Sequence, residues 1–160
     1  MKKCLIPFVV ALVLLAVLIG CKNQNSPPTL AEVEAQYEAY SADIRCVAEF
    51  LSVSDYEDIF ISDASGTMLA DLERLHIEDK AVVDAVRRLL DKGGYRHISK
   101  RGNTISMLQW TGLRDIGCGI ACSIQKADTP EVEFVTELIP MHAGGWYYYV
   151  SDYETWRNAQ

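Results

Sequence analysis

Residues 29–52, TLAEVEAQYEAYSADIRCVAEFLS, begin with a helix-start signal and continue with a helical repeat. Thr29 and Glu32 have the spacing of a capping box and directly follow two prolines. The apolar residues that come next recur at alternating spacings of three and four, which places them on one helical face. They are Leu30, Val33, Tyr37, Tyr40, Ile44, Val47 and Leu51.

A second stripe of apolar and small residues runs beside this face and makes it wide. A coiled-coil seam is narrower, so the width predicts a helix over about residues 30–52 that lies across a sheet. Dimerisation through a coiled coil is the alternative. The second stripe consists of Ala35, Ala39, Ala42, Cys46 and Phe50.

A strand and two helices are expected next. Residues 59–61 have the composition of a short strand, which the turn-like residues 63–66 close. Residues 68–75 predict a weakly patterned helix. Asp79 caps a second firm helix, which the pair Gly93-Gly94 ends. The residues of this helix that should face inward are Val82, Val83, Val86, Leu89 and Leu90.

From residue 95 onward the pattern has a period of two, which indicates consecutive β-strands. The first two strands form a hairpin around residues 100–103, and Pro140 stops the fourth. These elements predict an α+β fold, in which the long N-terminal helix and the second helix pack on an antiparallel, mostly meander β-sheet. The expected strands are residues 95–99, 104–110, 118–124, 131–138 and 146–150.

The N-terminal residues have the layout of a secretory signal. Lys2 and Lys3 form a positive region, residues 5–19 are almost wholly apolar, and Gly20 stands directly before Cys21. The run Leu18-Ile19-Gly20-Cys21 resembles the lipobox of bacterial lipoproteins. The resemblance implies that the Cys21 thiol carries diacylglycerol, that the chain is cut before Cys21, and that the new N-terminus is acylated.

The lipobox resemblance divides the chain into three parts. Residues 1–20 are expected to be a signal peptide, residues 21–28 a polar tether and residues 29–160 a single α+β domain. The domain would lie outside the cytoplasm, anchored to a bacterial membrane by the lipid on Cys21, since two or more acyl chains make such attachment long-lived. The alternative is an uncleaved anchor, but the apolar run is shorter than the ~20 residues that a membrane span needs.

The net charge argues against nucleic acid as a partner. The formal charge is −7, and loss of Lys2 and Lys3 with the signal makes it −9. An acidic domain is repelled by phosphate backbones and by anionic lipid headgroups, and the sequence has no basic stripe with interleaved aromatic residues. The expected partners are the membrane, through the lipid, and an envelope protein or glycan.

The order of elements over residues 30–150 is similar to that of nuclear-transport-factor-2-like domains. In that family a long first helix lies over a curved sheet and encloses a pocket. The resemblance implies a cone-shaped domain with a pocket between the first helix and the sheet.

Three cysteines remain in the expected mature domain, because Cys4 leaves with the signal and Cys21 is lipidated. Cys118 and Cys122 share one strand face with Cα atoms ~13 Å apart, whereas a disulfide needs a separation of about 4.4–6.8 Å. We therefore expect these two not to be bonded to each other. Cys46 is either a core residue or the partner of one strand cysteine, which an oxidising envelope permits.

No catalytic, metal or cofactor motif stands out in the sequence. His76, His97 and His142 lie in no spaced metal motif, and the cysteines lack the second ligand pair that zinc requires. Cys122 and His97, expected on neighbouring strands, are a candidate nucleophile and base, but the group that would orient the base is unidentified. We therefore assign no catalytic residue, no metal and no cofactor, and favour a non-enzyme.

The C-terminal segment is rich in aromatic residues, which are rigid and amphipathic and so suit sugar rings or a protein partner. In the strand at residues 146–150, Trp146 and Tyr148 point to one side and Tyr147 and Tyr149 to the other. One pair must face the core, so the other is available for binding or is covered.

A short final helix is predicted after this strand, because Ser151 and Glu154 repeat the capping-box spacing. Its residues Tyr153 and Trp156 either add to a binding surface or fold back and cover the outward tyrosines. The candidate binding residues are Tyr147, Tyr149 and Trp156.

These features favour a membrane-anchored envelope lipoprotein that acts as a binding or interaction module. The first alternative is a small-ligand-binding or enzymatic domain with a pocket between the first helix and the sheet. The second alternative is a protective or inhibitory protein.

Overall fold

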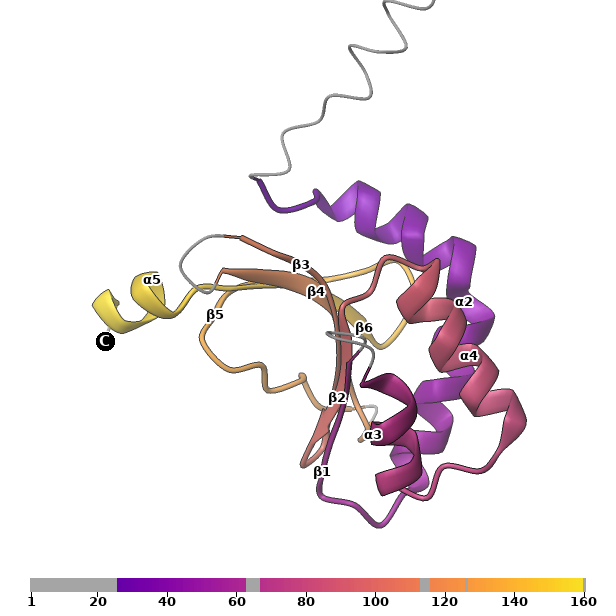
Figure 1. Ribbon diagram of the computed structural model, residues 1–160. Helices are drawn as coiled ribbons and strands as arrows, with labels where there is room; N and C mark the ends of the chain where they lie inside the picture. Colours follow the sequence, from indigo (N-terminus) through magenta and orange to yellow (C-terminus); the bar gives the residue numbers. More distant parts are fainter. Residues whose placement is uncertain (1–25, 63–66, 113–115, 126, 160) are drawn as a thin grey trace, which may run out of the picture.

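The computed structural model describes residues 26–62, 67–112, 116–125 and 127–159 (Figure 1). The signal-like run with Cys21 and the turn expected at residues 63–66 lie outside the described residues. No helix in the described part of the chain combines the length and the apolar character of a membrane span. The elements are α2 (Leu30–Val53), β1 (Asp58–Ser62), α3 (Met68–Arg74), α4 (Lys80–Asp91), β2 (His97–Arg101), β3 (Thr104–Thr111), β4 (Gly117–Ser123), β5 (Val135–Pro140), β6 (Trp146–Ser151) and α5 (Tyr153–Asn158).

A six-stranded antiparallel sheet organises the domain, with the strand order β1-β2-β3-β4-β6-β5. Neighbouring strands follow one another along the chain, except that β6 lies between β4 and β5. The sheet is strongly curved, and α2, α3 and α4 lie on one side of it (Figure 1). The predicted α+β fold is confirmed, including the long first helix and the mostly meander sheet.

The first helix, α2, begins as its sequence predicts. The Glu32 carboxylate accepts hydrogen bonds from the backbone N–H and the hydroxyl of Thr29, at 2.9 and 3.0 Å. The helix bends at Tyr40, whose φ and ψ of −122° and 16° are not helical, and so follows the curved sheet. The Tyr40 hydroxyl donates to the Lys92 carbonyl at 2.9 Å, which ties the bend to the end of α4. The buried residues of α2 are Val33, Tyr37, Ile44, Val47 and Leu51.

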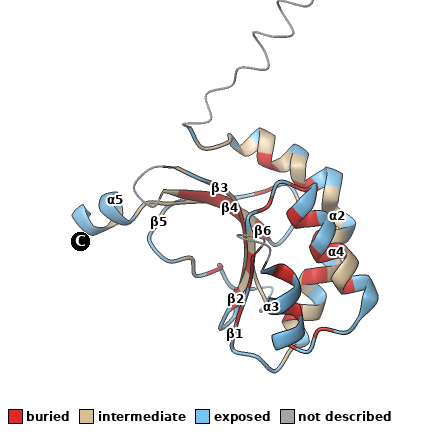
Figure 2. Cartoon of the chain, viewed as in Figure 1, coloured by how far each residue is buried: buried red, intermediate tan, exposed pale blue. Residues whose placement is uncertain are grey.

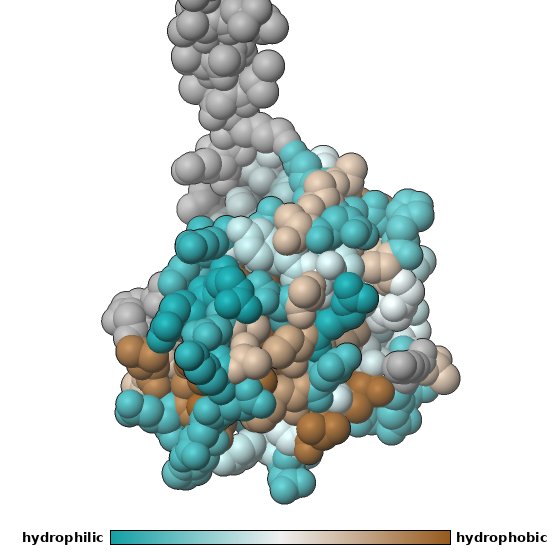
Figure 3. Space-filling model, turned by 90° about the vertical axis from the view of Figure 1, so that its right-hand side faces the viewer, coloured by the Kyte–Doolittle hydropathy of each residue, from teal (hydrophilic) through white to brown (hydrophobic). Residues whose placement is uncertain are grey.

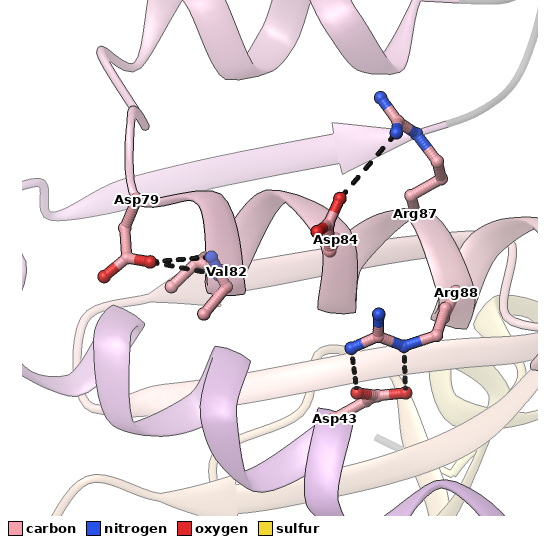
Figure 4. A network of polar contacts seen from close by, with 7 residues as sticks. Asp43, Asp79, Val82, Asp84, Arg87 and Arg88 are labelled. Carbon is pink, nitrogen blue, oxygen red and sulfur yellow. Dashed lines mark hydrogen bonds and ion pairs between the residues drawn. The ribbon is translucent and has the colours of Figure 1, made fainter.

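The second firm helix, α4, is joined to α2 by an ion pair (Figure 4). The Asp79 carboxylate caps α4 by accepting from the backbone N–H of Ala81 at 2.8 Å. Arg88 donates two hydrogen bonds to the Asp43 carboxylate of α2, at 3.0 and 2.7 Å. The predicted inward residues all pack in the core, although Val83 is only half-buried, and Ala85, which was not predicted, is buried too. The buried residues of α4 are Val82, Ala85, Val86, Leu89 and Leu90.

The main hydrophobic core lies between the helices and the facing side of the sheet (Figure 2). The rings of Tyr37 and Trp146 pack with their centroids 5.6 Å apart. The Tyr148 hydroxyl donates to the Pro28 carbonyl at 3.1 Å, which fixes the point where the chain enters α2. The core residues of the strands are Ile59, Ile61, Ile98, Ile105, Met107, Cys118, Ile120, Trp146 and Tyr148. This side of the sheet is therefore filled by packed side chains.

The hairpin between β2 and β3 is tighter than predicted. Lys100 and Arg101 belong to β2, so the turn consists of Gly102 and Asn103. Gly102 has a φ of +51°, which glycine adopts without the clash of a Cβ atom. Lys100 points toward the helices, and its Nζ donates to the Ser54 carbonyl at 2.8 Å, at the C-terminal end of α2. A cation at this end of a helix complements the helix dipole.

Two expectations about the C-terminal part are wrong. The fourth strand begins at Val135 rather than near residue 131, because Phe134 has a φ of +54° that interrupts the extended backbone. Ser151 does not cap the final helix and is instead the last residue of β6. The cap is Asp152, whose carboxylate accepts from the Thr155 backbone N–H at 3.0 Å.

Helix α3 ends in a Schellman motif with His76 in the left-handed position. The Ile77 N–H donates to the Leu72 carbonyl at 2.9 Å, and the His76 N–H donates to the Glu73 carbonyl at 3.0 Å. His76 has a φ of +51°, a conformation that disfavours any residue with a Cβ atom.

We therefore expect His76→Gly to raise the free energy of unfolding by roughly 1 kcal/mol, measured by urea denaturation. Glu78→Gly is the control, because Glu78 is also exposed but has no positive φ. At residue 78 glycine should lower the free energy of unfolding, because it increases the entropy of the unfolded chain. A loss of stability in His76→Gly equal to that of the control would contradict the strain at this position.

The loop between β5 and β6 is held to α2 by Glu34. One carboxylate oxygen of Glu34 accepts from the His142 backbone N–H at 2.9 Å and lies 2.7 Å from the His142 ring Nδ1. The hydrogen bond from the His142 backbone, with a smaller contribution from its ring, lowers the pKa of Glu34 below the ordinary glutamate value.

This contact gives the domain a pH-dependent contribution to stability. The pKa of Glu34 is lower in the folded chain than in the unfolded chain. The contribution to stability is therefore fully present when the pH is above the pKa of Glu34 in the unfolded chain, and it is lost as the pH falls through the pKa of Glu34 in the folded chain. We expect Glu34→Gln to be less stable than the parent in urea at neutral pH, with the two converging in acid. His142→Ala keeps the backbone donor, so it should retain part of the pH dependence. A constant difference between Glu34→Gln and the parent at all pH values would contradict this assignment.

Candidate functional site

A groove with a volume of about 820 Å³ opens on the side of the sheet away from the helices. This side of the curved sheet is concave, and the segment that leads into β5 crosses its open side (Figure 1). We call residues 131–134 of this segment the strap. Sites for small ligands typically have volumes of ~300–1,000 Å³, so the groove is of the right size for one.

Below the floor of the groove, β4 consists of small residues on the side away from the helices. Gly117, Gly119 and Ala121 lie on this face, since their neighbours Cys118 and Ile120 belong to the core on the other face. An added Cβ on Gly119 would clash with the carbonyl oxygen of Met107 in β3, so only glycine fits there. The small residues therefore let β3 and β6 pack closely on β4, and Gly117 alone of the three lines the groove.

Hydroxyl groups from three strands line the floor. The hydroxyls of Ser99 in β2 and Ser106 in β3 are hydrogen-bonded at 2.8 Å. Burial raises the pKa of the Tyr149 phenol, while a hydrogen bond with the Ser106 side chain opposes that rise. Ser99, Ser106 and Tyr149 therefore form a row of neutral groups that can both donate and accept hydrogen bonds.

His97 and Phe60 form one end of the groove. Their rings pack with centroids 4.8 Å apart, and Phe60 is 50% exposed on the edge strand β1. Burial lowers the pKa of His97, so its ring is neutral at neutral pH. A neutral imidazole offers one donor and one acceptor beside the Phe60 ring.

The strap is fastened to the hairpin between β2 and β3. The Glu131 backbone N–H donates to the Thr104 hydroxyl at 2.8 Å. The Arg101 guanidinium forms an ion pair with Glu133 of the strap and lies 3.9 Å from the Asp58 carboxylate. These contacts hold the strap across the groove.

An aromatic cluster stands at the end of the strap. Phe134 is 37% exposed, and its ring makes edge contacts with Tyr153 and Trp156 at centroid distances of 5.0 and 5.2 Å. The Arg157 guanidinium lies 5.7 Å from the centre of the Tyr153 ring. The positive φ of Phe134 directs this ring to the groove, which it lines.

The structure separates the three binding residues that the sequence suggested. Tyr147 and Tyr149 share the groove face of β6, as the strand alternation predicts, and Trp146 and Tyr148 face the helices. Tyr149 is only 3% exposed and packs into the floor, whereas Tyr147 is half-buried and lies outside the groove lining. Trp156 packs on Phe134, so it contributes to the wall of the groove through that residue.

The suggested pair of Cys122 and His97 is wrong as a catalytic unit. Cys122 packs against the core on the helix side of β4, whereas His97 lines the groove on the other side, and β3 lies between their strands. Burial raises the pKa of Cys122 to about 12 and that of Cys118 to about 11, so both thiols stay protonated.

The three cysteines within the described residues are free, which confirms that Cys118 and Cys122 are not bonded to each other. Cys46 makes no disulfide either, and burial, together with the nearby acids Asp79 and Asp43, raises the pKa of its thiol. Among the described residues, no cluster of three or more His, Cys, Asp or Glu side chains could hold a metal ion.

Sequence reasoning missed the groove residues Phe60, Ser99, Ser106 and Phe134. The sequence did carry a signal for Ser99 and Ser106. They alternate with the core residues of β2 and β3, and they line the groove. Phe134 gave no such signal, since its left-handed backbone cannot be read from a strand-like pattern. Comparisons of the chain with protein families, with curated proteins and with solved structures found no match.

Proposed function

We propose that this chain is a binding module whose ligand occupies the groove on the helix-free side of the sheet. The groove of about 820 Å³ carries this proposal, because it combines neutral hydrogen-bonding groups on its floor with exposed aromatic rings at its edges. Sites of this kind orient a small ligand through a few polar groups and hold it through apolar contact. Among the described residues, core side chains fill the space between the first helix and the sheet, where the sequence suggested a pocket.

The surface over the helices also supports the groove, rather than the helix side of the domain, as the binding face. Seen from that side, it is mostly hydrophilic, with apolar side chains in small, separate groups (Figure 3). Large exposed apolar patches mark partner sites, and this face shows none in that view.

Binding accounts for the groove residues better than catalysis does. The Ser99 and Ser106 hydroxyls bond to each other, and His97 stands beside Phe60 rather than beside a nucleophile. Nucleophilic catalysis needs a base within hydrogen-bond reach of the nucleophile. An enzymatic role remains the alternative function, with the groove as its site.

We further propose that the module is a bacterial envelope lipoprotein, anchored outside the cytoplasm by a lipid on Cys21. The lipobox-like run before Cys21 supports this anchor. The tether up to Pro28 would span at most about 25 Å when fully extended. The bond from Tyr148 to the Pro28 carbonyl sets the end of this tether, so the domain would act close to its membrane.

The anchor is tested by mass spectrometry of the full chain expressed in a bacterial host with lipoprotein processing. The expected result is a mature chain that begins at an acylated Cys21 in the membrane fraction. Cys21→Ser is the control and should lose the lipid. A mature chain that begins at Met1 without modification would contradict the anchor.

The groove is tested by nuclear magnetic resonance titration of the full chain, held in a detergent, with a library of small fragments. The amide signals that shift should belong to β2, β3 and the strap. Fragment binding that maps to α2 and α4 instead would contradict the groove as the ligand site. Binding of a protein partner that covers the groove would instead favour the protective or inhibitory role.

A further inference from the structure

We infer that the groove binds a neutral oligosaccharide. This inference rests on the proposed function and adds the chemical class of the ligand. Each pyranose ring offers an apolar face of C–H groups and a rim of hydroxyls. A matching site needs exposed aromatic rings together with neutral donors and acceptors.

Two aromatic rings supply the apolar contacts. Phe60 comes from the edge strand β1 and is 50% exposed, with one side of its ring packed on His97. Phe134 comes from the strap and is 37% exposed. Both line the groove, so the ring faces that the protein leaves uncovered are available to sugar rings.

The polar groups of the groove are suited to uncharged hydroxyls. Ser99, Ser106 and the neutral His97 ring can each donate or accept a hydrogen bond. Arg101 adds donors and Glu133 adds acceptors at the edge, and their ion pair fixes both side chains. A sugar hydroxyl both donates and accepts, so it can pair with every one of these groups.

The charges of the lining do not favour an anionic ligand. Its cations are Arg74, Lys100 and Arg101, and its acids are Asp58, Glu131 and Glu133. Arg101 is paired with Glu133 and lies near Asp58, while Arg74 bonds to Asp71 of its own helix at 3.4 Å. The Lys100 ammonium donates to the Ser54 carbonyl on the helix side of the sheet. A phosphate or a polyanion would also be repelled by the net charge of −7.

The conformation of Phe134 supports a role in binding. A phenylalanine with a φ of +54° is strained, and such residues gather at binding sites where the strain positions a side chain. Tyr153 and Trp156 hold the ring from behind. Glycine or asparagine would satisfy the backbone at lower cost, so the aromatic ring has a purpose beyond the turn.

The test is a titration of the full chain with cellotriose, maltotriose and triacetylchitotriose, followed by amide shifts. The detergent must lack a sugar headgroup. At least one of these neutral trimers should shift the signals of β2, β3 and the strap in a saturable manner. Trigalacturonate is the anionic counterpart and should bind about tenfold more weakly or not at all.

Variants locate the binding in the groove. Phe60→Ala and Phe134→Asn should each weaken binding by about tenfold or more, because they remove an aromatic contact. Tyr56→Ala is the matched control, since Tyr56 is a 42% exposed aromatic residue outside the groove lining. It should bind like the parent. The double variant Ser99→Ala with Ser106→Ala keeps both rings and tests the hydroxyls; it should also lose about tenfold.

The outcomes separate this inference from the proposed function. Fragments or peptides that bind in the groove, while none of the neutral trimers does, would overturn the sugar and leave the groove as a binding site. If neither fragments, peptides nor sugars bind in the groove, both the oligosaccharide inference and the proposed binding function are overturned. Neutral trimers that bind equally well to Phe60→Ala and Phe134→Asn would also overturn the inference.

Discussion

Gly119→Ala is expected to lower the free energy of unfolding by about 3 kcal/mol or more. The added Cβ would clash with the carbonyl oxygen of Met107 and lie 3.0 Å from the Cα of Leu108. Both of these atoms belong to the backbone of β3, in which Leu108 is the register partner of Gly119. No side-chain rotation relieves such a clash, so β3 and β4 would have to separate near the centre of the sheet.

Two other glycines provide matched controls in urea denaturation. At Gly117 the added Cβ would meet side-chain atoms, the Ser151 hydroxyl at 2.9 Å and a Leu108 methyl at 3.0 Å, which can move aside. At Gly144 it would meet nothing within 4 Å. The loss of stability should therefore be largest for Gly119→Ala, smaller for Gly117→Ala and near zero for Gly144→Ala. Equal stability of the Gly119 and Gly144 variants would show that the strands are not packed in this register.

Those elements that rest on local signals could be predicted from the sequence. The Thr29 and Glu32 spacing, the Asp79 cap and the period of the apolar residues each act within a few residues. They are sufficient to place α2 and α4. The faces of β4 could be predicted for the same reason, because alternation along a strand is local. The position of β6 between β4 and β5 depends on pairing between distant segments, which no local signal carries.

The end of the fourth strand shows where local patterns mislead. Residues 131–138 alternate in a strand-like manner, yet the backbone turns at Phe134 and the register shifts between Val135 and Glu137. The contacts that fix this part are distant ones, from Glu131 to Thr104 and from Glu133 to Arg101. The strap, and with it the groove, therefore follows from tertiary contacts rather than from strand propensity.

The candidate site was less predictable than the fold. Alternation correctly separates Tyr147 and Tyr149 from Trp146 and Tyr148, but it does not say which pair meets the helices. That choice depends on where α2 docks, and the contact between Tyr37 and Trp146 decides it. The opposite face is not simply open to solvent, because the strap and β5 cover part of it and enclose Tyr149 in a second, smaller cluster.

We expect Tyr149→Ser to lower the free energy of unfolding by about 3–5 kcal/mol, as removal of a buried aromatic ring generally does. Tyr149 is 3% exposed and packs with Leu108, Ala121 and Leu138 beneath the groove. Replacing it would leave a cavity between β4, β5 and β6. Such a loss approaches the whole stability of many domains of this size, so the variant should be largely unfolded at moderate temperature.

Two comparisons in thermal and urea denaturation make this expectation specific to the buried ring. Tyr149→Phe keeps the ring and removes only the hydroxyl, which should cost about 0.5–1.5 kcal/mol. Tyr147→Ser, on the same face of the same strand but half-buried, should cost less than Tyr149→Ser by about 2 kcal/mol or more. If the two serine variants lose equal stability, the strap does not cover Tyr149. The groove would then be an open sheet surface, on which both tyrosines are free to bind, as the sequence alone suggested.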